Sequence, residues 1–181
     1  MRSKAKKITL SALFSALMVV SGFLRIPLPP MSITLQLQVA LLSGLLLGGE
    51  WGCISVLTYA TIGLVGLPVF AGGGGFSYLL QPTFGYILGF AVAAFVTGKL
   101  SSIGTKSVKE IVISLAVGLA IVYGIGLVYA AIILTAYLGQ TIALGEFLLA
   151  YAVWTLPKDL LLTAACVPLV KRLRAAQKAS E

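Results

Sequence analysis

The chain has 181 residues, of which 59% are hydrophobic and 10% are charged, whereas an ordinary soluble domain has about 25% charged residues. This composition excludes a water-soluble globular protein and indicates an integral membrane protein with a single domain, residues 1–181. The net charge of +8 does not predict nucleic-acid binding, because the basic residues gather in three short clusters between apolar runs.

The first apolar run, residues 8–24, follows a basic N-terminal segment and is short for a membrane span, which needs about 20 residues. A cleaved signal peptide has the same outline, but no A-x-A site ends this run and the rest of the chain is also apolar. We therefore expect a retained helix. Ala12 and Ala16 lie four residues apart on it, a spacing that allows close packing within the protein or against a partner subunit.

The remaining uncharged runs predict five further helices, at about 35–49, 51–65, 80–98, 110–136 and 146–170. Residues 51–98 divide into two spans because no helix would keep the stretch "GLPVFAGGGGFSY". Small residues four apart, Gly44/Gly48 and Gly85/Gly89, predict close packing between these helices. The predicted fold is an all-α integral membrane protein with six transmembrane helices.

Basic residues predict the orientation of these helices. If the N-terminus is cytoplasmic, the inner segments hold 11 of the 13 lysine and arginine residues, which places both termini in the cytoplasm. The 11 are Arg2, Lys4, Lys6, Lys7, Lys99, Lys106, Lys109, Lys171, Arg172, Arg174 and Lys178. Arg25, outside, either attracts an anionic group of a ligand or extends to the lipid head groups.

Three connections would then lie outside, at residues 25–36, 66–82 and 138–146. The first two are rich in proline or glycine as well as in apolar and amide side chains, which is typical of a lid or of a cavity lining. The run Gly72–Gly75 does not match a P-loop; either its backbone amides approach a ligand or it forms a sharp turn. The sequence contains no histidine and no asparagine, which argues against a metal site or a hydrolase active site.

Lys158 and Asp159 interrupt the last apolar run, 147–170. A charge in the middle of a membrane costs about 2.5–3.5 kcal/mol on insertion scales, and such residues usually face a cavity or a partner. Tyr151, Trp154 and Thr155 precede the pair by one or two turns on the same side of the predicted helix. The pair therefore predicts a polar site in a cavity, although two mutually neutralising charges that only position the helix are the alternative.

Three segments, "PMSITLQLQ", "GLPVFAGGGG…LLQPTFGYILGF" and "LPKDLLL", resemble the BioY family, the biotin-binding S components of energy-coupling factor (ECF) transporters. The resemblance covers nearly the whole chain. It implies a biotin-binding subunit, not an enzyme and without a cofactor, that captures biotin outside a prokaryotic plasma membrane. It also implies a transmembrane coupling protein and two ATPases as partners, with the A-x-x-x-A motif at Ala12 and Ala16 as the docking site for the coupling protein.

In this resemblance Asp159 binds the biotin head group, whose ureido ring offers two N–H donors and one carbonyl acceptor. Lys158 or Gln81 would donate to the ureido oxygen. The expected ring-packing residues are Trp154, Tyr151, Phe70 and Tyr78, and Thr155, Gly73, Gly74, Thr34 and Gln36 complete the expected site.

The chain departs from the family pattern at two places, because Leu162 stands where members often have lysine and Gly72–Gly75 contain no asparagine. Our hypothesis is that Lys158 takes over part of the lysine's role. The fold also permits an S component for another vitamin, or an autonomous proton-coupled carrier that uses Asp159 as its protonatable group.

Overall fold

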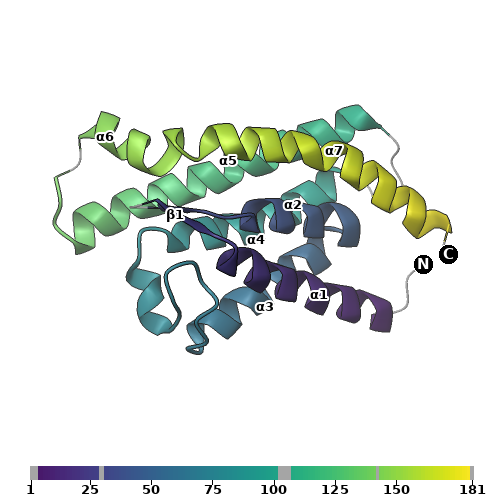
Figure 1. Ribbon diagram of the computed structural model, residues 1–181, viewed down its shortest axis with the longest axis horizontal. Coiled ribbons are helices and arrows are strands. Elements are labelled where there is room, and N and C mark those ends of the chain that lie inside the picture. The colour runs from purple at the N-terminus through teal and green to yellow at the C-terminus, as the bar shows by residue number, and fades with distance from the viewer. Residues whose placement is uncertain (1–3, 29–30, 102–106, 142, 180–181) are drawn as a thin grey trace.

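Helices form most of the computed structural model, which describes residues 4–28, 31–101, 107–141 and 143–179. They are α1 (Lys4–Phe23), α2 (Gln36–Leu47), α3 (Gly49–Leu64), α4 (Phe84–Leu100), α5 (Val108–Ile132), α6 (Leu144–Leu148) and α7 (Leu156–Ala179). Helices α5 and α7 run side by side along one side of the molecule, and α1 to α4 form the other side (Figure 1). The start of α1 and the end of α7 lie at one end of the molecule, and α6 lies at the opposite end. The predicted all-α class is confirmed.

The membrane-spanning helices differ in length. Among the described residues, three segments are long and apolar enough to cross a membrane by themselves: Lys4–Phe23, Val108–Tyr137 and Leu144–Ala176. Helices α2 and α4 are apolar but shorter, with 12 and 17 residues. At 1.5 Å per residue, α2 is roughly 18 Å long, which is less than the hydrocarbon core. Helix α2 alone therefore does not cross the membrane, and neighbouring segments must cover the remaining thickness.

A short β-hairpin precedes α2 and was not predicted. Strand β1 (Ile26–Leu28) pairs antiparallel with β2 (Met31–Ile33), with Ile26 opposite Ile33. In Figure 1 the hairpin extends from the start of α2 toward the end of the molecule that holds α6. The hairpin is hard to predict because proline argues against a strand. Pro27 lacks the N–H that an interior strand donates and is tolerated only at a sheet edge.

The last predicted helix, 146–170, is divided in the structure. A π-helical turn, η3 (Leu149–Val153), follows α6, and α7 begins at Leu156 and continues to Ala179. Another π-helical turn, η2 (Ile133–Tyr137), follows α5. Pro157 explains where α7 begins, because the second position of a helix needs no N–H donor and the proline ring fixes a helical φ.

Glycines bring the helices into close contact. A Cβ on Gly44 would lie 2.1 Å from Ala94 O in α4, and one on Gly98 would lie 2.3 Å from Gly49 N in α3. On the other face of α4, a Cβ on Gly85 would lie 2.2 Å from Tyr129 Cβ in α5. The predicted close packing at Gly44, Gly85 and Gly89 is confirmed, since a Cβ on Gly89 would lie 3.0 Å from Val122 Cα in α5; Gly48 instead ends α2 with a φ of 89°.

A buried arginine attaches α7 to two other helices. The Arg174 guanidinium donates to Leu45 O, 2.7 Å from Nη2 and 3.2 Å from Nε, and to Ser101 Oγ, 3.1 Å from Nη1. Leu45 lies in the last turn of α2, and Ser101 directly follows α4. Arg174, which the sequence suggested only as an orientation signal, is thus also a structural link.

Candidate functional site

A cavity of 520 Å³ lies between residues 32–37, which include the end of the hairpin and the start of α2, loop 66–82 and helices α4, α5 and α7. Eight of the predicted substrate-binding residues line it: Thr34, Gln36, Tyr78, Gln81, Tyr151, Thr155, Lys158 and Asp159. Its volume falls within the range of about 300–1,000 Å³ that is typical of sites for small organic ligands. The cavity therefore gathers residues that are more than 120 positions apart in the sequence.

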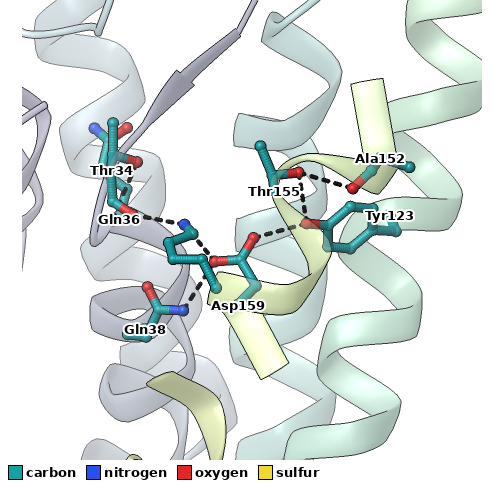
Figure 2. A network of polar contacts seen from close by, with 8 residues as sticks. Thr34, Gln36, Gln38, Tyr123, Ala152, Thr155 and Asp159 are labelled. Atoms are coloured by element: carbon teal, nitrogen blue, oxygen red, sulfur yellow. Dashed lines mark hydrogen bonds and ion pairs between the residues drawn. The ribbon is translucent and has the colours of Figure 1, made fainter. Parts of the chain in front are cut away.

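Asp159 is the centre of the polar network (Figure 2). Its side chain is buried, with 5% of the residue exposed. Gln38 Nε2 donates to Oδ1 at 3.0 Å, and the Tyr123 hydroxyl donates to Oδ2 at 2.7 Å. These donors come from α2 and α5, so the α7 carboxylate is held from two other helices.

Lys158 binds the same carboxylate from the neighbouring position. Its Nζ lies 2.5 Å from Asp159 Oδ1 and donates to Thr34 O at 2.9 Å. The Lys158 side chain is 22% exposed, and both members of the pair line the cavity. The pair is therefore both neutralising and part of the cavity wall, so the two sequence interpretations are compatible.

Gln36, the first residue of α2, connects the start of this helix to other parts of the chain. Its Nε2 donates to Met18 O at 3.3 Å and to the Tyr59 hydroxyl at 2.5 Å. The Tyr59 hydroxyl in turn donates to Val69 O at 3.3 Å. These bonds connect α1, α3 and loop 66–82 to the start of α2, so the cavity wall is held in place from several sides.

Phe70, Gly73 and Gly74 were predicted to meet the ligand, but the structure places them outside the cavity lining. Phe70 is 3% exposed and supports Tyr78 from behind, with 4.5 Å between the ring centroids. Gly73 has a φ of 123°, and a Cβ on Gly74 would lie 2.1 Å from Leu67 O. These glycines shape the turn, whereas Gly72 lines the cavity, so the two roles considered for this run fall on different residues.

Trp154 also lies outside the cavity lining, and 72% of the residue is exposed. The prediction assumed a continuous α-helix that would place Trp154 on the same side as Tyr151 and Thr155. The π-helical turn η3 directly before Trp154 changes the helical phase, so Tyr151 and Thr155 reach the cavity and Trp154 does not.

Several cavity residues were missed. Tyr123 and Tyr86 lie in apolar helices, where a tyrosine is no clear signal of a site, and Gln140 lies in a connection with no assigned role. The Tyr86 hydroxyl donates to Tyr151 O at 2.6 Å and so fixes η3. Gln38 does not line the cavity but bonds Asp159, and it was detectable in principle, because an amide in an apolar helix interior needs a polar partner.

The predicted docking residues lie on the outer face of α1. Ala12 and Ala16 are exposed, whereas Ser11 and Ser15, one position earlier, are buried against α3. Ser11 Oγ lies 2.9 Å from Ser55 Oγ, and Ser15 Oγ donates to Ser55 O at 2.8 Å. The face that carries the A-x-x-x-A motif is therefore open to a partner. Arg25 is exposed and is not part of the cavity lining.

Comparison with known proteins gives one consistent result. The model of the BioY family matches residues 1–179. A probable biotin transporter BioY of Lysinibacillus sphaericus is 40% identical over 90% of this chain and 83% of its own length. The biotin transporter BioY of Lactococcus lactis subsp. cremoris is 32% identical over 94% and 92%.

Among solved structures, a crystal structure of the S-component for biotin from an ECF-type ABC transporter has the same fold. It superposes on this chain with a TM-score of 0.81, at 31% sequence identity, and covers 97% of this chain and 95% of its own.

Proposed function

Because the chain belongs to the BioY family, we propose that it is the biotin-binding S component of an ECF-type importer and that the cavity around Asp159 holds biotin. The observation that supports the site most directly is the buried Asp159 carboxylate, which lines a cavity of suitable size for a small organic ligand. Membership of this family of transport proteins also agrees with the expectation that the protein is not an enzyme.

The chemistry of the cavity suits biotin. The Asp159 carboxylate and the Lys158 ammonium supply a charged acceptor and a charged donor for the ureido ring. Tyr78, Tyr86 and Tyr151 line the same cavity and offer ring surfaces to the fused bicycle. No group of three or more potential metal ligands occurs in the described part of the chain.

The partners in our proposal are a transmembrane coupling protein and two ATPases in a prokaryotic plasma membrane. The exposed Ala12 and Ala16 on α1 support a flat docking face, since small residues allow the closest approach of two helices. The distribution of basic residues supports cytoplasmic termini, which would place loop 66–82, part of the cavity wall, outside.

Equilibrium dialysis of the purified protein against a panel of labelled vitamins tests the substrate. We expect saturable binding of biotin alone, with Asp159→Asn weakening it by about tenfold to a hundredfold, because a hydrogen bond to a charged group contributes about 1.5–3 kcal/mol. Tighter binding of another vitamin would reject biotin as the substrate.

Uptake into proteoliposomes separates the proposed importer from an autonomous carrier. We expect biotin to accumulate only when the coupling protein and the ATPases are present with ATP. Uptake that persists without the ATPases and collapses with an uncoupler would identify a proton-coupled carrier instead.

A further inference from the structure

We propose that the site reads only one edge of the ureido ring: Asp159 accepts a single N–H, Lys158 donates to the ureido oxygen, and Tyr123 is the positioning residue that enforces this division. The inference rests on the proposed function, because it takes biotin as the ligand. It is carried by the hydrogen bonds that already occupy Asp159 before any ligand enters.

An ionised carboxylate has about four lone-pair sites, two on each oxygen. Within the part of the chain that the structure describes, Oδ1 of Asp159 accepts a hydrogen bond from Gln38 Nε2 at 3.0 Å and forms an ion pair with Lys158 Nζ at 2.5 Å. Oδ2 accepts from the Tyr123 hydroxyl at 2.7 Å. Oδ1 is therefore occupied by two cationic or amide partners, whereas Oδ2 has one hydroxyl partner and retains an acceptor site for a ligand.

Tyr123 holds its position on Asp159 through a relay of hydroxyl groups. The Tyr123 hydroxyl lies 2.8 Å from Thr155 Oγ1 and 2.7 Å from Asp159 Oδ2. Since a bond to a carboxylate is stronger than a bond to a neutral hydroxyl, the Tyr123 proton points at Asp159. The Thr155 hydroxyl has one proton, which it shares between Tyr123 at 2.8 Å and Ala152 O at 3.2 Å. A second ligand N–H on Oδ2 would displace this proton and leave a buried hydroxyl without its acceptor.

Lys158 supplies the complementary donor. An ammonium group has three donors; Lys158 Nζ donates one to Thr34 O and forms an ion pair with Asp159 Oδ1. A further donor is left for a ligand, and Lys158 and Asp159 both line the cavity. A neighbouring donor and acceptor match the C=O and one N–H of a cyclic urea, whose second N–H then points away from Asp159.

Two analogues of biotin test the division. In each, one ureido N–H is replaced by an ether oxygen, giving the two isomeric cyclic carbamates with nearly the same shape as biotin. Dissociation constants are measured for biotin and both analogues with the full-length wild-type protein and with Asp159→Asn. We expect one analogue to lose about tenfold to a hundredfold more affinity in wild type than in Asp159→Asn, and the other to lose equally in both.

The outcomes separate this inference from the proposed function. If wild type does not bind biotin, the proposed function fails. If wild type binds biotin but both carbamates, or neither, couple to Asp159, only the single-edge inference is overturned.

Tyr123→Phe tests the positioning role, and Tyr129→Phe is its control. Both residues lie on α5 and both hydroxyls donate to an oxygen, but the Tyr129 hydroxyl bonds Leu79 O and the residue does not line the cavity. Without the Tyr123 hydroxyl, Oδ2 can accept either N–H, so the affinity ratio of the two carbamates should fall toward one. Tyr129→Phe should keep the wild-type ratio.

An equal loss of affinity for all three ligands in Tyr123→Phe would mean a merely structural role and would overturn the assignment. Thr155→Val, which removes the donor to Tyr123 but leaves Tyr123 in place, provides a second variant if Tyr123→Phe does not fold. It should reduce the carbamate ratio in the same direction, and an unchanged ratio would count against the relay.

Discussion

Lys158 and Asp159 form a contact that their spacing does not favour. Side chains at adjacent helical positions point about 100° apart and do not normally face each other. Lys158 reaches Asp159 Oδ1 because its long stem bends back, and the bond to Thr34 O holds it there. The ammonium group is therefore held over the cavity by protein acceptors, so its position does not depend on a ligand.

Lys158→Met is expected to weaken biotin binding by about tenfold to a hundredfold, because it removes a charged donor while keeping the apolar stem. The control is Lys171→Met, which removes an exposed lysine from the same helix. Equilibrium dialysis of both purified variants measures the effect, and unchanged affinity in Lys158→Met would remove Lys158 from the site.

At the scale of elements, the helices are joined in two different ways. Glycines let the backbones of α2, α3 and α4 touch, as the contact of Gly98 with Gly49 shows. Helix α7 is attached by polar groups as well as by apolar packing, at Asp159 in the cavity and at Arg174 near its end. The first kind of contact is sensitive to volume, whereas the second is sensitive to the loss of donors.

Gly98→Ala should destabilise the protein by about 1–3 kcal/mol, because the new methyl would overlap the α3 backbone at Gly49. Gly124→Ala is the matched control, since a Cβ there meets nothing within 4 Å and alanine favours a helix over glycine. Thermal unfolding followed by size-exclusion chromatography compares the two, and equal melting temperatures would contradict the close contact.

Arg174→Met should lower the melting temperature by about 5 °C, because two buried carbonyl groups would lose their donor. Arg172→Met removes the same charge from an exposed position two residues earlier and should leave the melting temperature nearly unchanged. If both variants melt alike, the effect belongs to net charge and not to the hydrogen bonds.

At the scale of the whole molecule, α1 presents its serines inward and its alanines outward. Ser11 and Ser15 bond Ser55, so the rotation of α1 about its axis is fixed by polar contacts with α3. This rotation is what exposes Ala12 and Ala16. A partner helix could therefore approach α1 without any change in the helix bundle.

Ala12→Phe combined with Ala16→Phe should abolish ATP-dependent biotin uptake in reconstituted vesicles but leave biotin binding unchanged. The bulky rings would prevent close approach at the docking face, which lies away from the cavity. Ala165→Phe, on an exposed face of α7, is the control and should retain uptake. Full uptake by the double variant would exclude this face as the docking site.

The sequence was sufficient where a single physical effect dominates. Uninterrupted apolar runs predicted the helices, and the cost of charges in a membrane singled out Asp159 and Lys158. It was insufficient where several segments act together. The phase of Trp154 depends on a π-helical turn, and the role of Tyr123 depends on the approach of α5 to α7. No local pattern in the sequence distinguishes Tyr123 from a tyrosine that only fills space.

The burial of Arg174 makes its attachment less sensitive to ionic strength than a surface ion pair is. The guanidinium neutralises the partial negative charge of the helix dipoles at the carboxyl ends of α2 and α4, and it does so in a buried setting. The exposed pair of Lys99 and Glu50, in contrast, is open to screening by salt. Concentrated salt should therefore weaken the exposed Lys99–Glu50 pair before it weakens the attachment of α7. The part of the cavity wall that α7 provides should keep its position at salt concentrations that screen surface ion pairs.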